Sequence, residues 1–85
     1  MPTISMFYGI IISMYYNDHN PPHIHAKYQG KEVVFDLEGN LLEGEFPKKQ
    51  SRLVVAWIEI HKDSIEANWE LARSKQPLHK IDPLK

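Results

Sequence analysis

The most distinctive segment of this sequence, residues 17–25, holds three histidines, one aspartate and two adjacent prolines. It reads Asn17-Asp18-His19-Asn20-Pro21-Pro22-His23-Ile24-His25. Two consecutive prolines do not fit a helix interior or a central strand, so they predict a loop that ends at His23. Side chains at positions i and i+2 of a strand point to the same face. The sequence therefore predicts that His23 and His25 project together from the start of a strand, beside Asp18.

The segment before this loop favours β structure. Residues 4–16 are rich in β-branched and aromatic side chains, which strands prefer. Gly9 interrupts the run and indicates either a tight turn between two short strands or a bulge in one long strand. A period of two beyond this glycine predicts the core-facing residues Ile10, Ile12, Met14 and Tyr16.

The segment after the loop predicts a hairpin and a short extended piece. A strand over residues 23–28 leads into a turn at Gly30, and a return strand covers residues 31–37. Residues 41–46 read as either a short edge strand or an extended linker. We therefore expect an antiparallel sheet of three to four strands within residues 4–46.

The spacing of apolar residues changes after Pro47, which can begin a helix at its first turn. Apolar side chains then recur every three to five residues, which predicts an amphipathic helical segment over about residues 48–74. One helix or two helices would fit, since Asp63-Ser64 could cap a second helix. The predicted buried stripe consists of Leu53, Trp57, Ile60, Ile65, Trp69 and Ala72.

Length and composition indicate the fold class. The chain has 85 residues, of which 42% are hydrophobic and 25% charged, as in ordinary globular proteins. We predict one α+β domain over residues 1–85, in which the C-terminal helical segment covers the small antiparallel sheet. Residues 76–85 form a short tail that either frays or lies across the sheet, with Ile81 and Leu84 as its anchors.

Composition also excludes several classes of function. Ten basic and eleven acidic side chains give a formal net charge of −1, so no overall basic field attracts nucleic acid. The absence of cysteine rules out disulfides, thiolate nucleophiles and cysteine-based zinc sites. The longest apolar stretch, residues 6–14, is far shorter than the about 20 residues that span a bilayer. No secretory signal is visible, so we expect a cytoplasmic protein without membrane association.

His23 and His25 could serve as two ligands of a metal ion. A catalytic metal site needs about three protein ligands and an open position. The third ligand could come from Asp18 or His19 in the loop, or from His61 in the helix. The residue types would suit zinc or another divalent metal, although the spacing matches no established zinc signature.

The same histidine pair could perform acid–base catalysis. Imidazoles titrate near neutral pH, so one can accept a proton while the other donates one. Such a pair can cleave RNA, because the 2′-hydroxyl supplies the nucleophile. His61 would support the pair if the helix packs nearby. The cations that could hold a phosphate are Lys27, Lys31 and Arg52.

A third interpretation is structural. The two prolines could pin a sharp corner, with the imidazoles bonded to backbone groups that the loop exposes. The loop and strand could equally form a plain surface that recognises a partner protein. On this view His61 is a hydrogen-bonded boundary residue, and the basic run of residues 48–52 is a solvated face.

The sequence resembles the bacterial domain-of-unknown-function 4160 family over nearly its whole length. The matching residues begin with Met1-Pro2-Thr3. The family motif continues through Asn17, Asp18, Pro21, Pro22, His23, His25, His61 and Trp69. The resemblance implies a small prokaryotic cytoplasmic protein encoded beside a partner of the domain-of-unknown-function 2442 family, in an arrangement that looks like a toxin–antitoxin pair. It implies no established catalytic residue, substrate or cofactor.

Together these observations lead to one first expectation and two alternatives. We first expect a toxin–antitoxin-like component that acts on RNA, with His23, His25 and His61 as catalytic residues. Its binding residues would be Asp18, Lys27 and Arg52. The alternatives are a non-catalytic protein-binding module and a metal-binding protein with the ligands His23, His25 and His61. The pattern does not decide whether the protein is an enzyme, and pairing of a bare sheet edge would give a homo-oligomer.

Overall fold

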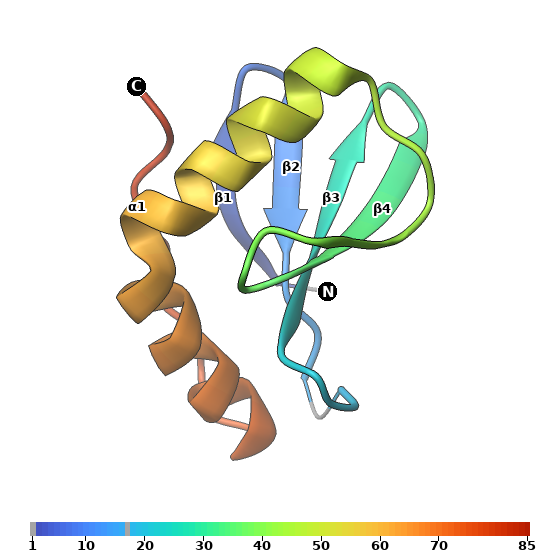
Figure 1. The fold of residues 1–85 in the computed structure, drawn as a ribbon. Helices are drawn as coiled ribbons and strands as arrows, with labels where there is room; N and C mark the ends of the chain where they lie inside the picture. Colours follow the sequence, from blue (N-terminus) through green and yellow to red (C-terminus); the bar gives the residue numbers. More distant parts are fainter. Residues whose placement is uncertain (1, 17) are drawn as a thin grey trace.

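Five strands are followed by one long helix and an irregular tail (Figure 1). The computed structural model describes residues 2–16 and 18–85. Met1 and Asn17, which both belong to the resemblance above, lie outside the described residues. The elements are β1 (Thr3–Phe7), β2 (Ile10–Ser13), β3 (His23–Tyr28), β4 (Lys31–Asp36), β5 (Leu41–Glu43) and α1 (Lys48–Arg73).

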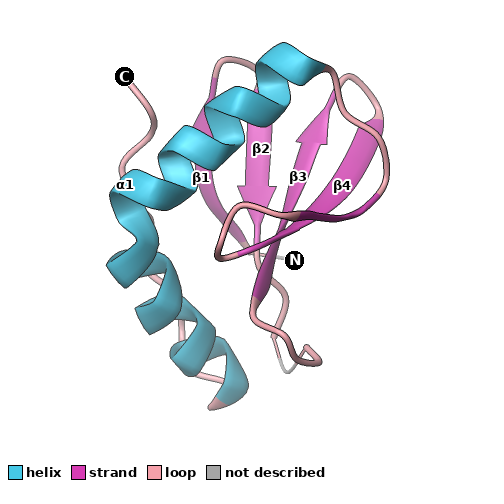
Figure 2. Cartoon of the chain, viewed as in Figure 1, coloured by secondary structure: helices cyan, strands magenta, loops and turns pink. Residues whose placement is uncertain are grey.

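The strands form one antiparallel meander in the order β1-β2-β3-β4-β5, with α1 packed across one face (Figure 2). The predicted α+β class is therefore confirmed, but the sheet has five strands rather than three to four. One additional strand arises at Tyr8 and Gly9, whose φ angles of 49° and 79° suit a tight two-residue hairpin turn. This turn divides the predicted first run into β1 and β2.

The other additional strand is β5, which pairs with β4 and is the sheet's short edge strand. The chain leaves β5 at Gly44, where φ is 86°. A Cβ atom at this position would lie 2.8 Å from the carbonyl oxygen of Glu32 and 2.8 Å from Cγ1 of Val33. Only glycine combines the left-handed backbone with this close approach.

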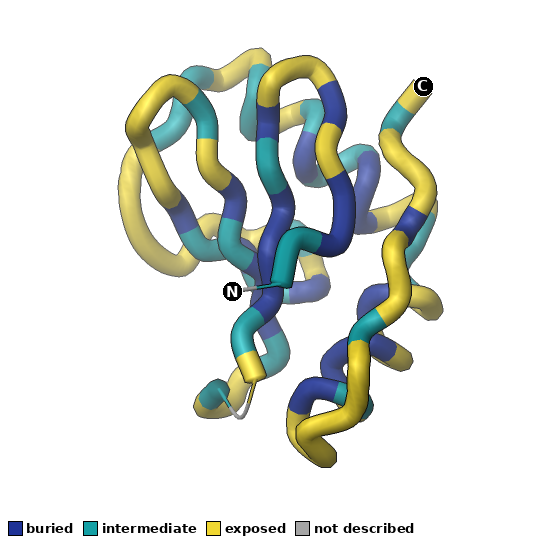
Figure 3. The backbone as a smooth tube through the Cα atoms, turned by 180° about the vertical axis from the view of Figure 1, so that it is seen from behind, coloured by how far each residue is buried: buried dark blue, intermediate teal, exposed yellow. Residues whose placement is uncertain are grey.

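The core lies between α1 and the sheet face that carries Ile24 and Ala26 of β3. Figure 3 shows how buried and exposed positions alternate along the strands. The predicted core residues Ile10, Ile12 and Met14 are all buried. Tyr16 is 44% exposed, which contradicts the prediction, because the chain has left the sheet after Ser13.

The helix is continuous but kinked at His61, whose φ of −110° and ψ of 21° are not helical. The predicted buried residue Ile60 is instead 65% exposed. The other predicted positions hold: Trp57, Ile65, Trp69 and Ala72 are buried and Leu53 is half-buried, so the observed stripe differs mainly in taking Val54 and Ile58 in place of Ile60. Its members are Val54, Trp57, Ile58, Ile65, Asn68, Trp69 and Ala72.

The C-terminal tail is bonded to both the helix and the sheet. Trp57 Nε1–H donates to the carbonyl oxygen of Asp82 over 2.9 Å. The Asn68 amide both donates to and accepts from the backbone of His79. The Ile81 N–H donates to the carbonyl oxygen of Ile4 over 2.8 Å, so the tail runs along the outer edge of β1.

The turn between β4 and β5 is organised by Asp36. Its Oδ1 accepts the N–H groups of Glu38 and Asn40, and its Oδ2 accepts the Asn40 side-chain amide. Burial raises the pKa of Asp36, but these hydrogen bonds outweigh it and leave the pKa below its ordinary value. No helix in residues 2–16 and 18–85 has the length and apolar character needed to cross a membrane.

Gly44→Ala should destabilise the fold by at least about 1–2 kcal/mol, the cost of a left-handed residue with a Cβ atom. The clash with the Glu32 carbonyl adds to this cost. Gly30→Ala is the matched control, because Gly30 also has a positive φ but nothing lies within 4 Å of its added Cβ. Urea unfolding should show the larger loss for Gly44→Ala. Equal losses would mean that the close approach is unimportant.

Asp36→Ala should lower the free energy of unfolding by about 1 kcal/mol at neutral pH, because it removes the hydrogen-bonded turn. The folded-state pKa of Asp36 is depressed, so the stabilisation by its carboxylate is complete above the unfolded pKa of about 3.9. It is lost as the pH falls through the folded pKa. The gap between wild type and variant in urea unfolding should therefore narrow in acid. A gap that is constant with pH would contradict this role.

Candidate functional site

The two histidines of β3 lie on the sheet face that α1 does not cover. Ile24 and Ala26 alternate with them and are fully buried in the core. In register, His25 pairs with Ser13 of β2 and Val34 of β4. No segment of the described chain crosses this face beside β3 (Figure 3), yet neighbouring side chains and the preceding loop leave His23 only 3% and His25 only 18% exposed.

His23 is the most buried of these polar side chains, with only 3% of it exposed. Its Nδ1 lies 2.7 Å from the carbonyl oxygen of Pro21, and its Nε2 lies 2.8 Å from Oδ2 of Asp18. Its ring centroid lies 5.2 Å from that of Trp69 in the C-terminal half of α1. The loop, in which the Asn20-Pro21 peptide bond is cis, and the helix together hold this ring in place.

The bond to Pro21 determines where the proton of His23 resides. A carbonyl oxygen can only accept a hydrogen bond, so Nδ1 must carry the proton. Nε2 therefore faces the Asp18 carboxylate either with a second proton, as an imidazolium, or as a free lone pair. A lone pair facing a carboxylate at 2.8 Å is repulsive, so this contact calls for a proton on Nε2 or for one cation bound by both atoms.

His25 lies between two carboxylates. Its Nε2 is 3.5 Å from Oδ2 of Asp18, and its Nδ1 is 3.3 Å from Oε2 of Glu32. Both nitrogens are buried, and neither makes a well-aligned hydrogen bond within the described residues. The contacts of His25 with Asp18 and Glu32 are therefore electrostatic contacts rather than hydrogen bonds. The ring of Tyr15 packs edge-on against His25 at 4.3 Å between centroids, and its hydroxyl lies 3.5 Å from Oε2 of Glu32.

The carboxylate of Asp18 is the centre of the cluster. Burial raises its pKa, but the backbone N–H of His19 and the rings of His23 and His25 outweigh this effect, so the pKa lies below its ordinary value. The pKa of Tyr15 is raised by burial and by the neighbouring charge of Glu32. The site therefore holds an ionised aspartate and a protonated phenol at neutral pH.

Asp18, His23 and His25 each offer one ligand atom, and the three atoms lie within 4.8 Å of one another. Among residues 2–16 and 18–85 this is the only group of three potential metal ligands that lie so close together. It opens into a pocket of about 220 Å³ that is also lined by Val34, Leu42 and Glu43. The neighbouring His19 lies at the rim of this pocket, with its ring 5.3 Å from that of His23 between centroids and its side chain 83% exposed.

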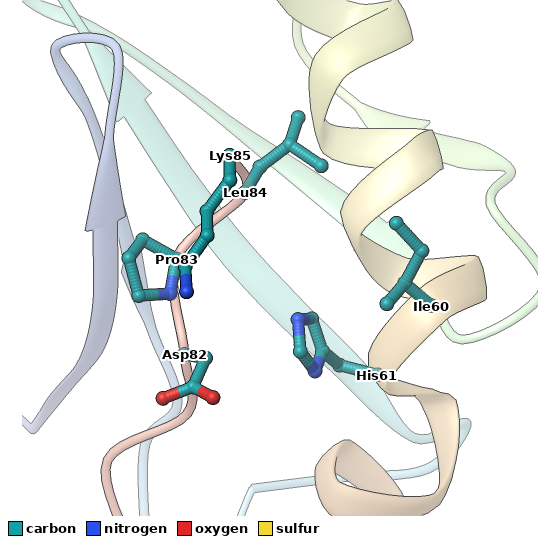
Figure 4. Close-up of a pocket in the computed structure, with 6 residues that line it drawn as sticks. All are labelled: Ile60, His61, Asp82, Pro83, Leu84 and Lys85. Atoms are coloured by element: carbon teal, nitrogen blue, oxygen red, sulfur yellow. The ribbon is translucent and has the colours of Figure 1, made fainter.

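His61 does not join this cluster, in contrast to the predicted set of His23, His25 and His61. It lies at the kink of α1, with its ring 5.8 Å from that of Trp57. It lines a different pocket of about 290 Å³, together with Asp82 and the end of the tail (Figure 4). Although that pocket is larger, the ligand chemistry gathers at Asp18, which takes the third place expected for His61.

Of the three predicted phosphate-binding cations, Lys31 is an exposed residue at the start of β4, and the other two lie far apart. Lys27 lies on the open face and lines a small pocket of about 130 Å³ with His25, Tyr15 and Glu32. It is the cross-strand register partner of Glu32. Arg52 is exposed in the first turns of α1, which packs on the opposite face of the sheet, and it is remote from the cluster.

Sequence reasoning missed Glu32, Tyr15 and the carbonyl group of Pro21. A signal for Glu32 exists in the turn at Gln29-Gly30, because a two-residue hairpin fixes the pairing of every residue behind it. That register puts Glu32 diagonally opposite His25 on the same face. Tyr15 lies beyond the end of β2, on the same face as Ser13. No local sequence pattern predicts its contact with His25.

The family model described as Domain of unknown function (DUF4160) matches residues 9–70. This match spans Asp18, His23 and His25, their neighbours Tyr15 and Glu32, and most of α1. No curated protein and no solved structure shows significant similarity to the chain. The resemblance noted in the sequence is thereby confirmed, and the chain belongs to the DUF4160 family.

Proposed function

We propose that this protein binds a divalent transition metal, with zinc as the best-suited ion, through Asp18, His23 and His25. The observation that carries the proposal is the hydrogen bond from His23 Nδ1 to the Pro21 carbonyl. It leaves Nε2 as the atom that faces Asp18. Histidines that bind metals characteristically donate their other ring N–H to a carbonyl or carboxylate, which fixes the ring and the tautomer.

The charges around the cluster support the same proposal. Nε2 of His23 and Nε2 of His25 both approach a single oxygen, Oδ2 of Asp18, at 2.8 and 3.5 Å. Without a cation, both rings need a proton at Nε2 to make these contacts favourable. One divalent ion can replace both protons, and two imidazoles with one carboxylate are ligands that zinc accepts.

Three protein ligands leave at least one coordination position open. Closed structural zinc sites usually have four protein ligands, whereas catalytic sites keep a position for water or substrate. Here the open side is the pocket lined by Val34, Leu42 and Glu43. A metal ion bound there would supply an activated water molecule or polarise a substrate.

The second candidate is metal-free cleavage of RNA by the histidine pair, as a toxin–antitoxin-like module would require. The observation in its favour is that the two rings lie 5.3 Å apart between centroids and share one pocket. The acidic side chains that line the pocket do not favour binding of an RNA phosphate. Asp18 and Glu43 line that pocket without a lysine or arginine, and Lys27 lines a separate pocket. A partner protein encoded alongside stays a prediction.

The chain, purified without a histidine tag, should bind one zinc ion per molecule in equilibrium dialysis. Asp18→Asn, His23→Ala and His25→Ala should each weaken binding by more than the about 10–100-fold that loss of an orienting partner costs. His19→Ala is the matched control and should bind as wild type does. Asp18→Asn keeps an acceptor for the His19 N–H, so it tests the charge with little change in the loop. Wild type without zinc after supplementation would overturn the proposal.

The second candidate makes a separate prediction. Metal-free cleavage of single-stranded RNA should persist in EDTA, produce cyclic phosphate ends and disappear in His25→Ala. Our first proposal predicts no RNA cleavage in EDTA. Cleavage that survives both EDTA and His25→Ala would indicate a contaminating nuclease, which repurification of the variant would reveal.

A further inference from the structure

Glu32 occupies for His25 the position that the Pro21 carbonyl occupies for His23. Its Oε2 lies 3.3 Å from Nδ1 of His25, while Nε2 of the same ring lies 3.5 Å from Oδ2 of Asp18. We propose that Glu32 is a positioning residue, which keeps the proton of His25 on Nδ1 and so presents the Nε2 lone pair to the metal. Its effect on affinity rests on the proposed metal-binding function, whereas its effect on the tautomer does not.

The hairpin register explains why Glu32 can reach this ring. The pairs Lys27↔Glu32 and His25↔Val34 are Cα partners between β3 and β4. Glu32 is therefore the diagonal neighbour of His25 on the open face, a relation that long side chains can bridge. The contact follows from the two-residue turn at the end of the hairpin and needs no loop to hold it.

Tyr15 restrains the same pair from the other side. Its ring packs edge-on against His25 at 4.3 Å between centroids, which limits rotation of the imidazole. Its hydroxyl donates toward Oε2 of Glu32 over 3.5 Å, the same oxygen that faces Nδ1. The oxygen nearest the imidazole is thus attracted from two sides, by an N–H and by an O–H.

The contact between Nδ1 and Oε2 is longer than a strong charge-assisted hydrogen bond of about 2.7–2.9 Å. A carboxylate at 3.3 Å nevertheless attracts an N–H and repels a lone pair, so the charge of Glu32 favours the proton on Nδ1. In the metal-free protein Asp18, 3.5 Å from Nε2, favours the proton on the other nitrogen, as does the intrinsic preference of a free neutral histidine. The change in the tautomer population of His25 when Glu32 is replaced therefore measures what Glu32 does.

The experiment measures the tautomer of His25 in the metal-free protein by ¹⁵N NMR of the imidazole rings, in alkaline solution where imidazoles are neutral. Glu32→Ala should raise the population of the Nε2–H tautomer above that of wild type. Glu32→Gln retains a carbonyl oxygen that can accept from Nδ1, so its population should lie closer to that of wild type. Equal tautomer populations in wild type and Glu32→Ala would overturn the inference.

Zinc affinity provides the second readout. Glu32→Ala should bind zinc about 10–100-fold more weakly than wild type, with a smaller loss in Glu32→Gln. Glu45→Ala is the matched control, because Glu45 is exposed and outside both pockets that His25 lines. If wild type binds no zinc, the metal proposal fails, while the tautomer still decides the role of Glu32. If zinc binds and Glu32→Ala binds it as wild type does, only the positioning role is overturned.

Discussion

The structure depends on the burial of one polar ring, that of His23. A buried imidazole is costly unless both nitrogens have partners. Here Pro21 and Asp18 from the preceding loop supply these partners, and Trp69 from the far half of α1 covers the ring. This requirement ties together three parts of the chain that are distant in sequence. It also places Asp18 where His25 can reach the same oxygen.

The kink at His61 follows from the same arrangement. The first half of α1 packs on the sheet through Val54, Trp57 and Ile58, whereas the second half brings Trp69 to His23 beyond the end of β3. A straight helix could not follow both surfaces. The sequence was compatible with one helix or two. The structure has one helix, which changes direction at His61.

Much of the fold could be predicted from local patterns. The period of two in β2, the helical period after Pro47 and the turn residues all correspond to elements of the structure. The strand count and the exposure of Ile60 could not be predicted. Gly9 fitted either a turn or a bulge, and Ile60 matched the helical period as well as Ile58 did. Tertiary packing decided both cases.

The candidate site was predictable only where its residues are close in sequence. Asp18, His23 and His25 lie within one loop and one strand, and the alternation rule placed both rings on one face. His61 was included because it is a histidine on an amphipathic helix, but the helix packs on the other side of the sheet. Glu32 required the strand register, and the role of Pro21 required a backbone atom that no side-chain pattern reveals.

The tail that runs along β1 has a consequence for how molecules of this protein can meet. Its bond to Ile4 occupies one border of the sheet, while β5 with its exposed Leu41 and Leu42 forms the other. Strand-to-strand growth into a fibre needs two free borders on every molecule. A sheet with one free edge can pair that edge with only one further copy, and the two copies are then related by a twofold axis. Because the tail occupies part of the β1 border, association through β5 would favour a pair over a fibre.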